Sequence, residues 1–101
     1  MANQMTVFRF KRPVAMREVE ATLLLSRLAV ASLHGDDRVR LQAQMKVDRA
    51  GRTCEIDTSS PVGQDLALIF AGFVRREFGD GAVDLFRALA AGTVLLVRMG
   101  A

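Results

Sequence analysis

Strict alternation of apolar and polar residues over residues 37–48 is the feature that most restricts the fold of this chain. In DRVRLQAQMKVD every second side chain is apolar, which is the period of a strand with one buried and one solvated face. DRAG at 48–51 has the residues of a hairpin turn, and we expect Gly51 to take a positive φ there. RTCEID at 52–57 predicts the returning strand, so the chain needs an antiparallel sheet.

The segments around this hairpin predict further strands and helices. MTVFRF at 5–10 is rich in β-branched and aromatic residues, and TVLLVRM at 93–99 predicts a last strand. Residues 14–33 and 61–78 carry apolar side chains at helical spacing. Residues 82–91, AVDLFRALAA, fit either a strand or a helix, and their alanine and leucine content favours a short helix.

The resulting order of elements, β-α-β-β-α-(α)-β, predicts one α+β domain over residues 1–101. A chain of 101 residues fits one domain and leaves no room for two. We expect a two-layer sandwich in which helices cover one face of a four-stranded antiparallel sheet, in the ferredoxin-like arrangement. Phe8 and Phe10 share one side of the first strand, so both are expected to point into the core.

The composition is that of a folded cytoplasmic protein, with 50% hydrophobic and 25% charged residues. Cys54 is the only cysteine and forms no intrachain disulfide, so a reducing compartment is expected and a secreted disulfide scaffold is excluded. One cysteine and one histidine do not make a metal site, and we predict neither a metal nor a cofactor. Neither a signal peptide nor an apolar run of membrane-spanning length is visible, so no membrane contact is expected.

The polar stretch DTSSP at 57–61 is the best candidate for a ligand site, because an expected strand gives way there to an expected helix. A helix N-terminus favours anions, so Thr58, Ser59 and Ser60 are candidates to bind a phosphate or to accept one. The same residues also suffice to start a helix, with Ser60 as N-cap and Pro61 at the first helical position. We favour the capping role.

Residues 56–63, IDTSSPVG, also resemble the Asp-Ser-Ser-Gly phosphoacceptor turn of STAS domains, the anti-sigma-factor antagonist family. In that family too a strand ends in the motif and a helix begins, so the resemblance implies a phosphate-dependent switch at residues 57–61. It covers only residues 56–63, and Pro61 stands where that family has glycine. The predicted hairpin before the motif also departs from the parallel sheet of that family.

Cations on the polar side of the predicted sheet suggest an alternative function. They are Arg9, Lys11, Arg38, Arg40 and Lys46. A sheet of this kind can bind RNA, but such modules stack bases on exposed aromatic rings. This chain has six phenylalanines and neither tyrosine nor tryptophan, and its net charge of +3 is modest for a nucleic-acid binder. A nucleic-acid-binding module is therefore the alternative and not the leading hypothesis.

The leading hypothesis is a small non-catalytic protein-interaction or regulatory module that self-associates. His34 is the only histidine, and although Asp36 and Asp37 follow it, no partner nucleophile is suggested, so we do not expect an enzyme. The apolar arc of the helix at 14–33 is wider than a surface helix needs. We predict a homo-oligomer, most simply a homodimer, and a protein partner. The predicted contact surface is Leu24, Leu25, Leu28 and Ala31.

Overall fold

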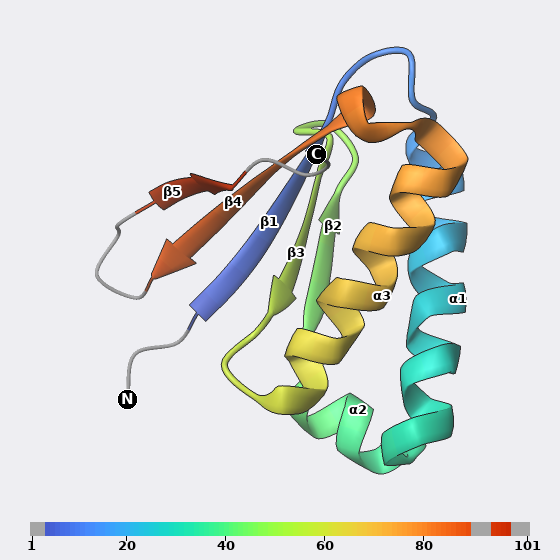
Figure 1. Cartoon of the computed structure of the whole chain (residues 1–101), viewed down its shortest axis with the longest axis vertical. Coiled ribbons are helices and arrows are strands. Elements are labelled where there is room, and N and C mark those ends of the chain that lie inside the picture. Colours follow the sequence, from blue (N-terminus) through green and yellow to red (C-terminus); the bar gives the residue numbers. More distant parts are fainter. Residues whose placement is uncertain (1–3, 90–93, 98–101) are drawn as a thin grey trace.

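Two long helices cover one face of an antiparallel sheet (Figure 1). The computed structural model describes residues 4–89 and 94–97. Its elements are β1 (Gln4–Phe10), α1 (Met16–His34), α2 (Asp36–Gln42), β2 (Met45–Asp48), β3 (Thr53–Asp57), α3 (Pro61–Phe78), the short 3-10 helix η1 (Asp80–Ala82), β4 (Val83–Leu89) and β5 (Val94–Val97).

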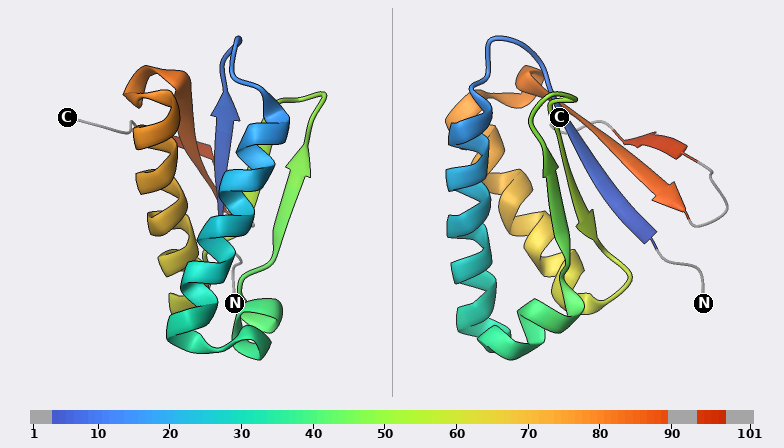
Figure 2. Two further views of the ribbon diagram at one scale, coloured as in Figure 1. Left: turned by 90° about the vertical axis from the view of Figure 1, so that its right-hand side faces the viewer. Right: turned by 180° about the vertical axis from the view of Figure 1, so that it is seen from behind.

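The sheet has the strand order β2-β3-β1-β4-β5, and every neighbouring pair is antiparallel. The first four of these strands have the ferredoxin-like order, and the helices α1 and α3 lie together on one side of them (Figure 2). The predicted two-layer α+β fold is therefore confirmed. The sheet has five strands and not four, because β5 is added outside β4.

The core lies between the sheet and the two long helices. Phe8 of β1 and Phe70 of α3 meet edge to face, with ring centroids 4.8 Å apart, and Phe10 packs against the same ring at 6.3 Å. Such pairs add roughly 0.5–1.5 kcal/mol to the stabilisation from buried area. Phe8 and Phe10 are fully or almost fully buried, so their predicted inward orientation is confirmed.

Residues 36–42 form a helix, so the strand predicted over 37–48 is wrong in its first half. The segment that reads as alternating also has a helical period, because Val39 and Ala43 are four residues apart and both are buried. Asp36 pairs with Arg40 across one helical turn, at 2.7 Å between carboxylate and guanidinium. Only residues 45–48 remain a strand, paired with β3.

Residues 83–89 form a strand, so the short helix predicted over 82–91 is also wrong. β4 pairs with β1 along its whole length, from Gln4 opposite Leu89 to Phe10 opposite Val83. This pairing with a distant segment outweighs the local preference of alanine and leucine for helix. Residues 90 and 91 of the predicted helix, and residues 93, 98 and 99 of the predicted last strand, lie outside the described residues.

In the β2–β3 turn, Arg52 takes the left-handed conformation, with φ of 59°. The positive φ predicted for Gly51 is therefore wrong. The side chain of Arg52 accounts for this choice. Its guanidinium donates to the main-chain oxygens of Phe10 and Lys11, each at 3.0 Å, and also to that of Val14. These bonds hold the β1–α1 connection against the hairpin, and they compensate for the strained backbone of a non-glycine residue.

We predict opposite effects for two glycine-to-alanine substitutions within α3. Gly63→Ala is expected to destabilise the protein by about 3 kcal/mol, because the new Cβ would overlap the main-chain oxygen of Asp57. Gly72→Ala meets no atom within 4 Å and is expected to stabilise by roughly 0.5–1 kcal/mol. Urea unfolding of the two variants and the wild type measures both effects. A Gly63→Ala protein as stable as the wild type would contradict this close approach of α3 to β3.

Candidate functional site

Ser60 caps α3, as the sequence predicted. Its Oγ accepts a hydrogen bond from the main-chain N–H of Gly63 at 3.1 Å, and Pro61 occupies the first turn. The same hydroxyl donates to the main-chain oxygen of Gln42 at the end of α2, at 2.7 Å. Ser60 therefore joins the start of α3 to the end of α2, a role that sequence reasoning missed because α2 was expected to be a strand.

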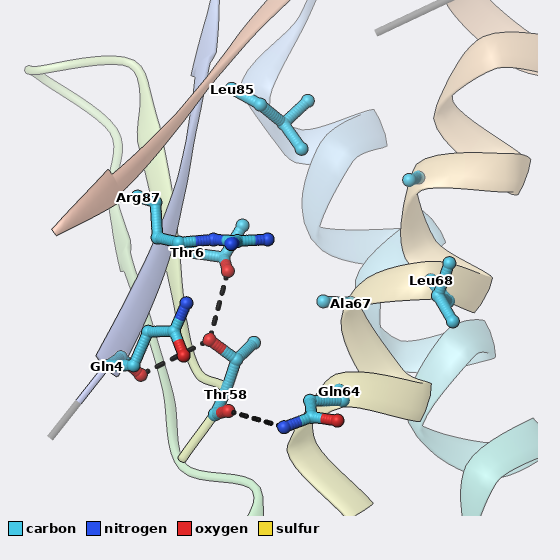
Figure 3. Close-up of a pocket in the computed structure, with 9 residues that line it drawn as sticks. Gln4, Thr6, Thr58, Gln64, Ala67, Leu68, Leu85 and Arg87 are labelled. Carbon is cyan, nitrogen blue, oxygen red and sulfur yellow. Dashed lines mark hydrogen bonds between the residues drawn. The ribbon is translucent and has the colours of Figure 1, made fainter. Parts of the chain in front are cut away.

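Thr58 attaches the same turn to β1 (Figure 3), and Ser59 adds a second link to that strand. Thr58 is only 4% exposed, and both its N–H and its hydroxyl donate to the main-chain oxygen of Gln4, at 2.8 and 3.2 Å. The hydroxyl of Thr58 also lies 3.0 Å from that of Thr6. The hydroxyl of Ser59 accepts from the N–H of Gln4 at 2.9 Å.

All three hydroxyls of the DTSSP turn thus have partners within the chain. An anion at Thr58, Ser59 or Ser60 would have to compete with these hydrogen bonds. The phosphate-dependent switch implied by the STAS resemblance stays a prediction, which mass spectrometry of the protein from its own cells would test.

Two of the five cations predicted to lie on the polar face of the sheet do not belong to the sheet. Arg38 and Arg40 lie on α2 and not on the sheet, because residues 36–42 are helical. Lys11 follows the last residue of β1 and is exposed. The prediction that these cations form one sheet surface with Arg9 and Lys46 is therefore wrong.

The open face of the sheet, on the side away from the helices, is mixed in charge. The guanidinium of Arg9 lies 4.9 Å from the ring centroid of Phe86, and Lys46 stands opposite Glu55 in the β2–β3 register. Alternation along the strands places four carboxylates on this face, namely Asp48, Glu55, Asp57 and Asp84. Nucleic-acid binding here stays a prediction, which titration with RNA and DNA at low salt would test.

The helix α1 runs along the outside of the molecule beside α3 (Figure 2). It carries exposed leucines on its outer side. Leu24, Leu25 and Leu28 are 58%, 60% and 66% exposed. Ala31, the fourth residue of the predicted contact surface, is half-buried against the core. We call the exposed surface of α1 on the side away from the core the outer face of α1. It consists of Ala21, Leu24, Leu25, Leu28 and Ser32.

His34 and Asp65 form a pair that sequence reasoning missed. Nε2 of His34 lies 2.7 Å from Oδ2 of Asp65, which ties the end of α1 to the first turns of α3. No motif connects two residues that are 31 positions apart. Within residues 4–89 and 94–97, no group of three His, Cys, Asp or Glu residues could hold a metal ion.

Cys54 is a core residue, as predicted. It is fully buried in β3, and this burial raises the pKa of its thiol to about 12, with the charge of Glu55 adding to the effect. A thiol with so high a pKa is neutral at physiological pH and is a poor nucleophile.

A pocket of about 500 Å³ opens between α3 and the strands β1 and β4 (Figure 3). The strands and the DTSSP turn line one side, mostly with polar residues, and α3 lines the other with Gln64 and three apolar residues. The lining residues are Gln4, Thr6, Thr58, Gln64, Ala67, Leu68, Ala71, Leu85 and Arg87. Sequence reasoning missed this pocket because it requires β4 to lie beside β1.

Comparisons with known proteins add no functional information. No protein-family model, curated protein or solved structure matches the chain. Among the helices that the structure describes, none combines the length and the apolarity needed to cross a bilayer.

We predict that Ser60→Ala destabilises the protein by about 1–2 kcal/mol, because it removes the cap of α3 and the bond to Gln42. Ser60→Asp keeps an acceptor for the N–H of Gly63 but cannot donate to Gln42. Its free energy of unfolding should therefore lie between those of the wild type and Ser60→Ala. Urea unfolding measures all three proteins, and equal stabilities would contradict a structural role for this hydroxyl.

Cys54 is expected to resist modification by a disulfide reagent at pH 8 in the folded protein and to react fully in guanidinium. The pKa of about 12 in the folded state lies above the ordinary value of 9.0. The contribution of this thiol to stability is therefore complete below about pH 9 and is lost as the pH rises towards 12. Rapid labelling of the folded protein at pH 8 would contradict the burial of Cys54.

Proposed function

We propose that this chain is a small, cytoplasmic, non-catalytic interaction module that forms a homodimer through the outer face of α1. The observation that carries the proposal is the exposure of Leu24, Leu25 and Leu28 together on that face. Isolated exposed leucines are ordinary on a protein surface, whereas adjacent ones on one helix face are typical of an interface. Such a module would act as a binding or regulatory subunit.

The residue composition of the outer face favours contact with another protein surface over exposure to water. At helical spacing from Ala21 to Ser32, the residues on this face are alanine, leucine and serine, and none is charged. A solvated helix face normally carries charged side chains. Removing each of these leucines from water contributes roughly 1–2 kcal/mol.

A second copy of the chain is the partner that fits this face best. A two-fold axis near the centre of α1 would place Leu24 of one copy beside Leu28 of the other. In this antiparallel packing, Arg17 of one copy faces the segment of the other copy that contains Asp37. Arg17 and Asp37 are exposed, and neither takes part in an ion pair among the described residues.

The mass of the protein in solution tests this proposal. At tens of micromolar, sedimentation should give twice the chain mass of 11.1 kDa for the wild type. The double variant Leu25→Glu/Leu28→Glu should sediment as a monomer, because two carboxylates would be buried at the interface. Its far-ultraviolet circular dichroism should match that of the wild type, since both leucines are exposed in the single chain.

Leu33→Glu is the matched control. Leu33 is on the same helix and is 71% exposed, but five residues after Leu28 it is turned away from the outer face by about 140°. This variant should remain a dimer. A wild type that stays monomeric when concentrated would refute the proposal, as would a Leu33→Glu variant that dissociates as readily as the double variant.

A further inference from the structure

The helix layer does not cover the whole sheet. The helices α1 and α3 lie over the β2-β3-β1 side, while β4 and β5 spread away from α3 (Figure 1). Side chains of β4 that point to the helix side therefore border the pocket between α3 and the sheet. None of the lining residues belongs to α1, so this pocket is separate from the proposed dimer face.

The position of Arg87 sets this pocket apart from ordinary surface. Along β4, Val83, Leu85 and Arg87 point to the same side of the sheet. Val83 is buried and Leu85 packs against the core, whereas Arg87, further along the same side of β4, is exposed and places its guanidinium at the pocket. The Arg87 side chain extends from β4 in the direction of α3 (Figure 3), and it joins no ion pair among the described residues.

Hydrogen-bond donors on the strand side of the pocket are available to a ligand. Thr6 stands directly opposite Arg87 in the β1–β4 register. The single proton of the Thr58 hydroxyl is directed to the main-chain oxygen of Gln4, so the Thr6 hydroxyl donates to Thr58. The guanidinium of Arg87 and the side-chain amide of Gln4 form no hydrogen bond within the described part of the chain. The guanidinium of Arg87 can only donate, and the amide of Gln4 can donate through its NH2 group, so both suit a ligand group that accepts.

The wall of the pocket that α3 forms indicates which chemical group the remainder of the ligand should have. Ala67 and Ala71 of α3 are half-buried on this wall, whereas Leu68 lies at its rim and is 71% exposed. These side chains can bury a short aliphatic chain. No Asp or Glu lines the described pocket, so no carboxylate there would pair with an ammonium group, which the charge of Arg87 would also repel.

We infer that this pocket binds a small aliphatic monocarboxylate that lacks an amino group. The carboxylate accepts from the guanidinium of Arg87, whose planar fork matches its two oxygens, and from the amide of Gln4. The aliphatic chain lies against Ala67 and Ala71 of α3 and Leu85 of β4. A volume of about 500 Å³ is within the usual range for a small-molecule site.

Titration with three probes of equal chain length tests the inference. Hexanoate, hexan-1-ol and hexylammonium are added to ¹⁵N-labelled protein at constant pH and ionic strength, and the amide resonances are followed by NMR. Hexanoate should shift the amides of Thr6, Thr58, Ala67, Leu68 and Arg87, with a Kd of about 1 mM or below. Hexan-1-ol should bind more weakly at the same residues, and hexylammonium should produce no shifts there.

Variants separate charge recognition from simple apolar binding. Arg87→Gln should weaken hexanoate binding roughly tenfold or more and leave hexan-1-ol binding unchanged. Arg87→Lys, which keeps the charge without the fork, should show an intermediate loss. Arg9→Gln, on the opposite face of the sheet, is the matched control and should bind hexanoate as the wild type does.

Three results would overturn the inference. The first is the absence of hexanoate shifts at these residues at several times the expected Kd. The second is hexylammonium binding as strong as that of hexanoate. The third is an Arg87→Gln protein with a folded spectrum and undiminished hexanoate affinity. Each of them would leave the dimer proposal untouched, because that proposal rests on α1.

Discussion

The hydrogen bonds of the turn between β3 and α3 are the constraint on which the other elements depend. Within a few residues, this turn is bonded to the start of β1 through Gln4, to the end of α2 through Gln42 and to the first turn of α3 through Gly63. Thr58 is almost completely buried there, so its polar groups have to be paired within the protein. The position of α3 over the sheet follows from these bonds and from the close approach of Gly63 to Asp57.

Two surfaces remain without partners once α3 is fixed in this way. α3 and α1 cover the β2-β3-β1 side of the sheet, so β4 borders an open pocket that contains Arg87. The outer face of α1, on the side of the helix away from the core, carries uncharged residues and exposed leucines. The proposed dimer and the proposed carboxylate site are both consequences of a helix layer that is narrower than its sheet and apolar on its outer side.

The sequence predicted the elements whose signals are local. The range 61–78 for α3 agrees with the structure because Ser60, Pro61 and Gly79 mark its two ends. The ferredoxin-like fold class also followed from the order of elements. The segments 36–42 and 83–89 were predicted wrongly because each fits both helix and strand, and the choice was made by contacts with distant parts of the chain. The pair of His34 with Asp65 and the pocket could not be predicted either, because each brings together residues that are far apart in the sequence.

The most direct test of the central claim, that the outer face of α1 joins two copies of the chain, is methyl NMR of leucine-labelled protein over a range of concentrations. The claim predicts that the methyl resonances of Leu24, Leu25 and Leu28 shift as the protein is concentrated, with intermolecular contacts between them. The resonances of Leu41, which is 76% exposed on α2, should stay constant. Concentration-independent resonances for the three α1 leucines, or shifts centred on another surface, would contradict the claim.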